Sequence, residues 1–191
     1  PLTAFAACEL RSPAPFSEAG FIAFNRVYVG TLERWGIFAN DDNPVARANV
    51  CPAINPPSES CFEAFSYTVK SDQPSAQSNF VIAGGAEAIP GASTYEGNII
   101  RPGDTSPEGM REKAIHVLGE MERRMNILDV GWQHATATQV YTVHDLHPFL
   151  ADGMVQRGAV PAGLTWYYAR PPVTGLEFEM DVRAVAVERT I

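Results

Sequence analysis

The chain has 191 residues, of which 46% are hydrophobic, and its net charge is −8. This length and composition fit one domain, or one domain with an added piece, built around a real hydrophobic core. The acidic balance argues against binding along nucleic-acid phosphates. No apolar run reaches a membrane-spanning length, and the three cysteines lack metal or disulfide spacing. We therefore expect a cytoplasmic protein with reduced thiols and no membrane segment.

The first part of the chain predicts an irregular arm, a helix and a β-hairpin. Residues 1–16 are small and proline-rich, which favours an irregular arm. Apolar side chains recur at helical spacing over residues 17–36, where a glycine ends the pattern. Residues 44–69 predict a hairpin with a Pro-Pro connector, and residues 71–78 have the composition of a linker.

The remainder predicts a larger unit. Residues 79–88 form a strand that ends in Gly84 and Gly85, where a ligand can approach the backbone closely. A long helix over 107–126 and a strand over 135–143 follow. A short helix over 147–158 and a closing hairpin over 161–187 end the chain. This order predicts an α+β fold in which helices cover one face of a mixed sheet.

The order of a short helix and then a hairpin occurs twice, which indicates a weak internal repeat. The first copy lies within residues 17–70 and the second within residues 147–187. We therefore predict an N-terminal half unit over 1–70, a linker over 71–78 and a complete unit over 79–191.

Two charged residues of the first hairpin are candidates for chemistry. Glu63 is the single charge on a strand face shared with Phe65 and Tyr67, so we expect partial burial and a raised pKa, as for a general acid or base. A strand-end carboxylate near water is the alternative. Arg47 follows and precedes alanines, which suits a bidentate pair with a carboxylate, either that of Glu63 or that of a substrate. Tyr67 fits a pocket wall or the core.

The closing strand alternates apolar side chains with Glu177, Glu179, Asp181 and Arg183. This pattern is typical of a solvated strand face or of a polar lining at a subunit interface, and one of the carboxylates could face a pocket. The histidines near residue 145 lack a third partner, so we expect no metal site.

The order of these segments resembles the RidA family. The resemblance rests on FVIAGG, EKAIHVLGEMERRM, ATATQVYTV leading to HDLHPF, and FEMDVRAVAV in the second part. FNRVY, PVARANV and CFEAFSYTV in the first part resemble the second half of the same domain. The resemblance implies a chorismate-mutase-like α+β fold, a homotrimer or multiple of three, and ligand clefts between subunits.

The resemblance also implies a function. Many RidA proteins hydrolyse enamines and imines without a cofactor. In these enzymes an arginine binds the substrate carboxylate, and a glutamate positions or activates water. Arg47 and Glu63 match these residues in the half unit, and Glu179, or Glu177 by a two-residue shift, matches the glutamate in the complete unit. Gly163 stands at the arginine position there, and Gly84 and Gly85 match the turn that faces the ligand.

We therefore expect a composite cleft, in which Arg47 and Glu63 face the glycine turn of the same or a neighbouring chain. The favoured substrate class is a 2-aminomuconate-type dicarboxylate, with Arg101 and Arg170 as candidates for its second carboxylate. The alternative is a non-catalytic protein that binds small carboxylates. The ribonuclease activity found in some members conflicts with the acidic charge.

Overall fold

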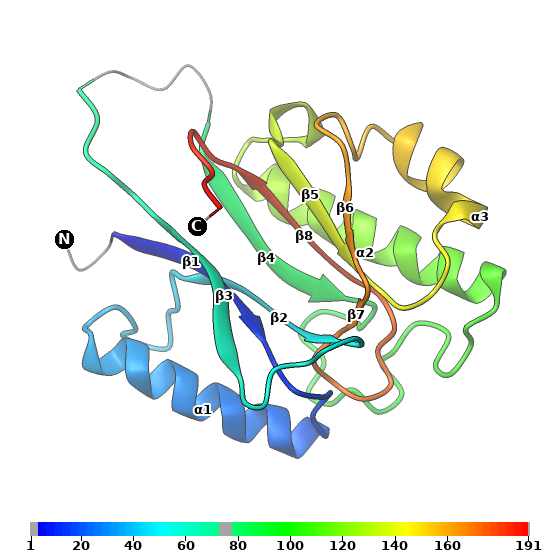
Figure 1. Cartoon of the computed structure of the whole chain (residues 1–191), viewed down its shortest axis with the longest axis horizontal. Helices are drawn as coiled ribbons and strands as arrows, with labels where there is room; N and C mark the ends of the chain where they lie inside the picture. Colours follow the sequence, from blue (N-terminus) through cyan, green and yellow to red (C-terminus); the bar gives the residue numbers. More distant parts are fainter. Residues whose placement is uncertain (1–3, 73–77, 191) are drawn as a thin grey trace.

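A computed structural model of the protein describes residues 4–72 and 78–190. The fold is α+β, as predicted, with two four-stranded mixed sheets and three α-helices (Figure 1). Within the described residues, no helix is both long and apolar enough to span a membrane. The central part of the predicted linker, residues 73–77, lies outside the described residues.

The first sheet has the strand order β3-β1-β2-β7. Its elements in chain order are β1 (Phe5–Arg11), α1 (Glu18–Arg34), β2 (Ala46–Pro52), β3 (Cys61–Tyr67) and β7 (Ala169–Arg170). β1 and β2 are parallel and are joined by α1, whereas β3 runs antiparallel to β1. α1 begins where the Ser17 side chain accepts a hydrogen bond from the Gly20 amide, and it packs Leu32 against Cys8 and Leu10 of β1.

The second sheet has the order β4-β8-β5-β6. Its elements are β4 (Phe80–Ala86), α2 (Pro107–Ile127), a 3₁₀ turn (Trp132–His134), β5 (Ala137–Tyr141), α3 (His147–Phe149), a π-helical turn (Leu150–Val155), β6 (Thr165–Tyr167) and β8 (Glu179–Ala184). Ser106 caps α2 and a proline occupies its first turn. The methionine-rich stripe of α2 is fully buried against β4 and β8, so it forms the main core.

Neither predicted hairpin forms. β1 lies between β2 and β3, and β5 lies between β6 and β8. The predicted irregular arm over 1–16 is therefore wrong in part, because Phe5–Arg11 is a central strand. Its polar residues hid this strand, since Glu9 and Arg11 pair with each other instead of facing water. Three strands of each part now share one topology: β1 is parallel to β2 and antiparallel to β3, and β5 is parallel to β6 and antiparallel to β8.

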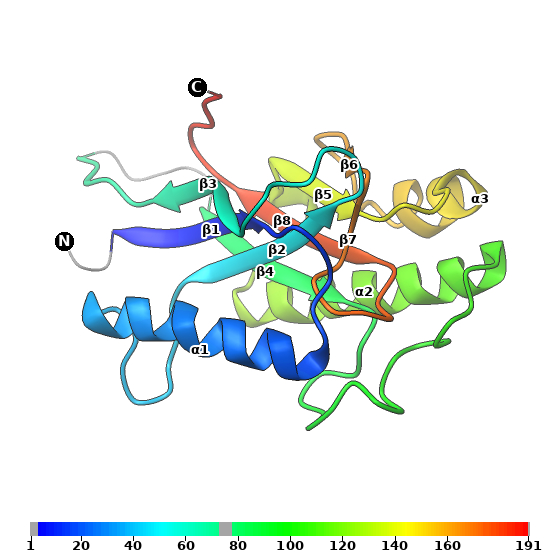
Figure 2. The ribbon, with the colours of Figure 1, turned by 60° about the horizontal axis from the view of Figure 1, so that its bottom comes forward.

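The two sheets pack face to face, with α1 and α2 on their outer sides (Figures 1 and 2). Glu9 of β1 connects the sheets, because it accepts hydrogen bonds from Gln139 at 2.9 Å and from Arg183 at 3.1 Å. Tyr141 donates to Asp181 at 2.7 Å in the same layer. The charged face of β8 is thus a polar lining between two layers, and a solvated face is ruled out because Asp181 is 4% exposed.

Candidate active site

Arg47 lies on β2, with its side chain against α1. Its guanidinium carbon lies 4.6 Å from the centre of the Tyr28 ring, 5.6 Å from that of Phe21 and 5.8 Å from that of Phe24. Among the residues that the structure describes, this guanidinium has no hydrogen-bond acceptor and no ion-pair partner. Burial lowers its pKa. A partly desolvated guanidinium without an acceptor is well suited to bind an anionic group.

These surroundings differ from the predicted ones. Successive residues of a strand point to opposite faces, so the alanines on either side of Arg47 face the other sheet. The neighbours of its side chain come from α1 instead, which adjacency in the sequence does not reveal. A pair with Glu63 across a hairpin is also wrong, because β1 separates the two strands.

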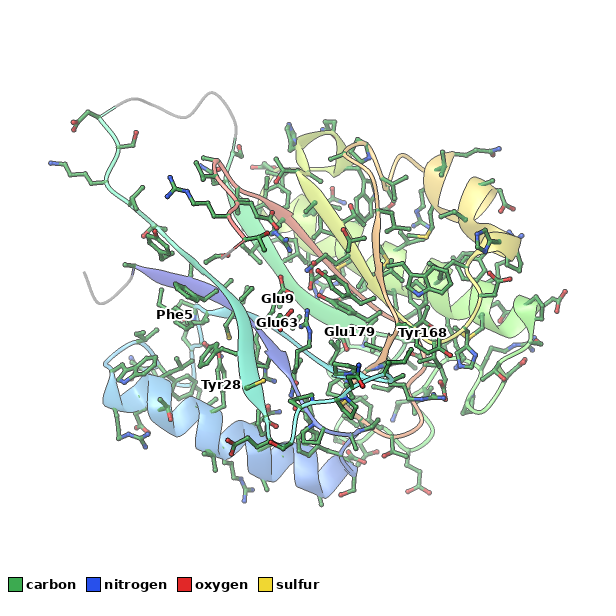
Figure 3. The ribbon with its side chains drawn as sticks, viewed as in Figure 1. Phe5, Glu9, Tyr28, Glu63, Tyr168 and Glu179 are labelled. Atoms are coloured by element: carbon green, nitrogen blue, oxygen red, sulfur yellow. The ribbon has the colours of Figure 1, made fainter. Side chains whose placement is uncertain are left out.

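Glu179 is the carboxyl group that lies near Arg47. It begins β8, is 4% exposed and, among the described residues, makes no hydrogen bond or ion pair. Desolvation raises its pKa to about 8, and the nearby Asp181 charge adds to this rise, whereas the Arg47 charge opposes it. At neutral pH the group is therefore mainly protonated and can first give up a proton and then accept one. Figure 3 shows Glu179 where the two sheets meet.

Gly84 allows the Glu179 carboxyl group to approach the backbone of β2. A Cβ atom at Gly84 would lie 2.2 Å from the Glu179 Oε1 atom and 3.1 Å from the Ala48 Cα atom. Any side chain here would therefore displace either the carboxyl group or the β2 backbone. Gly85 faces the opposite way, because its Cβ would meet the Met121 side chain of α2 at 2.8 Å. Of the two predicted glycines, only Gly84 borders Glu179 and Ala48, the residue that follows Arg47 on β2.

Arg124 of α2 fixes the glycine turn from behind. Its guanidinium donates to the Ala83 carbonyl at 2.9 Å and is held by Glu120 at 2.8 Å. Arg47 and Ala83 also line one hollow between the sheets, whose other walls combine small side chains of β1, β2 and β3 with the charged groups of Glu9, Asp181 and Arg183. Arg47 and the residue before the glycine turn therefore line one hollow within a single chain, and the composite substrate cleft stays a prediction.

Glu63 and Tyr67 do not lie near Arg47 and Glu179 within one chain. Both lie on β3, an edge strand, and both are exposed. The prediction that Glu63 is partly buried is wrong, because nothing within one chain covers this face of β3. Glu63 lies near Glu9 (Figure 3) and interacts electrostatically with Arg11. A role for Glu63 in a cleft between chains stays a prediction.

The other candidates are engaged elsewhere. Arg170 and His144 both pair with Glu177, and Arg101 lies 3.2 Å from Asp104. The two arginines therefore have protein carboxylates as partners, which weakens their predicted role toward a second substrate carboxylate. Gly163 lies in the turn before β6 with a φ of 95°. Within residues 4–72 and 78–190, no group of three His, Cys, Asp or Glu could hold a metal ion.

Sequence reasoning missed three polar residues around Arg47 and Glu179. Burial raises the pKa of Cys51 on β2 to about 12, and the Glu179 charge contributes to this rise. The Asn49 Nδ2 atom is buried and has no partner among the described residues. Tyr95, from the segment between β4 and α2, interacts electrostatically with both Glu179 and Arg47. Only the placement of Asn49 two residues after Arg47, on the same strand face, offered a signal in the sequence.

Comparison with known proteins identifies the family of the chain. The model of the family described as "2-aminomuconate deaminase CnbZ" matches residues 1–189. The 2-amino-5-chloromuconate deaminase of Comamonas testosteroni is 50% identical over 191 residues, which are the whole of this chain and 76% of that protein. Both comparisons confirm the prediction of a deaminase, an enzyme that acts on a C–N bond. The chain therefore belongs to the CnbZ family of 2-aminomuconate deaminases.

Proposed function

We propose that the chain hydrolyses a 2-aminomuconate-type enamine dicarboxylate and releases ammonia. One observation carries this proposal: the buried carboxyl group of Glu179 lies at Gly84 against Ala48, the residue next to the acceptor-free Arg47 on β2. The name of the relative from Comamonas testosteroni describes a substrate of the same class.

Arg47 supplies the binding step. Its guanidinium presents parallel N–H donors that match a carboxylate in a bidentate pair. The carboxylate next to the amine-bearing carbon is the one that Arg47 holds, which places that carbon toward Glu179. The Phe21 and Tyr28 rings stack along the guanidinium and limit its movement.

Glu179 supplies the proton transfers. It donates its proton to the enamine carbon β to the nitrogen, so the C=C bond is lost and the nitrogen lone pair completes the C=N bond of an iminium. The carboxylate then takes a proton from water as the water oxygen bonds to the iminium carbon, and the π electrons return to nitrogen. Glu179 next protonates that nitrogen. The C–N bond breaks as the hydroxyl proton returns to Glu179, which leaves a ketone and ammonia. Atoms and charge balance, and no cofactor takes part.

The test is ammonia release from freshly generated 2-aminomuconate. We expect Arg47→Ala to lose at least about 100-fold in kcat/KM, because a charge-assisted bidentate contact is lost. Arg26→Ala is the matched control, since Arg26 is an exposed arginine elsewhere on α1. Folding of both variants is checked by thermal melting. Turnover by Arg47→Ala at the wild-type rate would contradict the proposal.

We also propose a homo-oligomer, a trimer or a multiple of three, as the RidA resemblance implies. Phe65 is 61% exposed, Tyr67 64% and Val69 72%, all on or just after the edge strand β3. An exposed row of apolar side chains along an edge strand is typical of an interaction surface, and we propose that a second copy of the chain binds it. A cytoplasmic location is proposed because all three thiols are free.

A further inference from the structure

The segment between β4 and α2 is a loop that is ordered by its own hydrogen bonds. An antiparallel bridge joins Ala88 to Ile99 at its base, and the Ile89 amide donates to the Asn98 carbonyl at 2.8 Å. The Asn98 side chain donates to the carbonyls of Thr94 and Glu96, both at 3.1 Å. These bonds close the tip of the loop around Tyr95, so Tyr95 is held by a defined backbone.

This loop reaches α1 at one residue of its first turn. The Tyr95 amide donates to the Glu18 Oε1 atom at 3.1 Å, a contact between residues 77 positions apart. Phe21, which packs on the Arg47 guanidinium, follows Glu18 by three residues and so lies on the same side of the helix. Glu18 therefore brings the Tyr95 backbone beside the face of α1 that holds Arg47.

The Tyr95 side chain is half-buried there, and its hydroxyl makes no hydrogen bond with the described part of the chain. Its charge environment consists of Glu179, Glu18 and Arg47. Burial and the two carboxyl groups raise the Tyr95 pKa, so the phenol keeps its proton and remains a donor. This phenol donor has no acceptor, and its loop is anchored to the helix that packs on the acceptor-free Arg47 guanidinium, so an oxygen from outside the chain can serve both groups.

We infer that Tyr95 is a substrate-contact residue that donates a hydrogen bond to the carboxylate held by Arg47, and that Glu18 positions it through the Tyr95 amide. The inference rests on the proposed function of the Arg47 site. A carboxylate can accept from both at once, because two donors of Arg47 leave lone pairs free on its oxygens. This role concerns binding, so it acts on KM more than on kcat.

Tyr95→Phe tests the contact, because it removes the hydroxyl and keeps the ring. Binding is measured by calorimetry with muconate, a dicarboxylate that lacks the amine and is not turned over. We expect Kd to rise roughly 10- to 100-fold, the usual effect of one hydrogen bond to a charged group, with a matching rise in KM and kcat within about threefold. Tyr168→Phe is the control, since Tyr168 is 53% exposed. An unchanged Kd for Tyr95→Phe would overturn the inference.

Glu18 is tested by a pair of variants. Glu18→Gln keeps an oxygen for the Tyr95 amide, so we expect wild-type Kd and KM. Glu18→Ala removes the acceptor and should raise both by at least about threefold without a change in kcat. Equal values for the two variants and wild type would remove Glu18 from the account.

The same titrations separate this inference from the proposed function. If Arg47→Ala abolishes muconate binding while Tyr95→Phe binds normally, only the role of Tyr95 fails. If Arg47→Ala binds muconate and releases ammonia like wild type, the proposed site itself fails.

Discussion

Glu179 is a carboxyl group whose behaviour depends on what covers it. The polar face of β8 would be wet in an isolated sheet, and there a carboxyl group would ionise at its ordinary pKa. The first sheet covers this face, so burial raises the Glu179 pKa to about 8. Arg47 interacts with Glu179 across the layer and partly offsets that rise. The result is a proton donor at neutral pH that becomes a carboxylate at modest cost.

Glu179→Gln is expected to remove turnover and to stabilise the fold. The pKa of Glu179 is about 8 in the folded state, which therefore keeps the proton up to that pH, whereas the unfolded chain loses it near the ordinary value of 4.5. Wild-type stability therefore falls as pH rises through this window, by on the order of 3–5 kcal/mol, whereas a glutamine does not titrate. The gain in free energy of unfolding should be larger at pH 8 than at pH 5, measured by urea denaturation. A gain that shrinks with rising pH would contradict the assignment.

At the scale of elements, the close approach of β4 to β2 creates the site. Gly84 is the residue on which that approach depends, because a Cβ there would overlap the Glu179 carboxyl group. Strand β2 would otherwise hold Arg47 against α1 without a proton donor nearby. The repeat of one topology in both parts of the chain supplies matching sheets for this packing.

Gly84→Ala is expected to lower kcat/KM by at least about 10-fold and to destabilise the fold by about 1–3 kcal/mol, the usual effect of overpacking. Gly30→Ala is the matched control. Nothing lies within 4 Å of a Cβ at Gly30, which sits inside α1, so this change should stabilise the fold by about 0.5–1 kcal/mol. Thermal melting and ammonia release measure both. Wild-type stability and activity for Gly84→Ala would refute the tight contact.

Local patterns predicted the helices well. Apolar spacing and the serine caps of α1 and α2 are short-range signals, and both helices lie where the sequence predicts them. The strand partners were not predictable in this way. A Pro-Pro connector shows that two strands follow each other but does not show that they pair, and β1 was hidden because its charges are satisfied by the second sheet.

The same limit applied to the site. Arg47 was found because a lone arginine between alanines is conspicuous, and Glu179 was found through the resemblance. The choice of Glu63 as its near partner failed because strand alternation cannot tell which face another sheet covers. Tyr95 comes from an irregular loop with no periodic pattern, so only the folded structure could place it on α1, the helix that packs on Arg47.

At the scale of the whole molecule, the uncovered face of β3 predicts self-association. We expect light scattering to give a mass of three chains or a multiple of three, and Phe65→Lys to lower it to one chain, because a buried lysine at the contact would lack a partner. Val27→Lys is the control, since Val27 is an isolated valine on α1 and is 73% exposed. A wild-type protein that elutes as a single chain would contradict the proposed assembly.

The central claim is that Arg47 and Glu179, from two different sheets, act in one site. A double-mutant cycle of kcat/KM for ammonia release, with Arg47→Ala, Glu179→Gln and the combined variant, tests it most directly. We predict that each single variant loses at least about 100-fold and that the combined variant loses little more than the worse single one, because groups that act as a unit are strongly non-additive. Losses that multiply, or a Glu179→Gln variant that retains wild-type turnover, would contradict the claim.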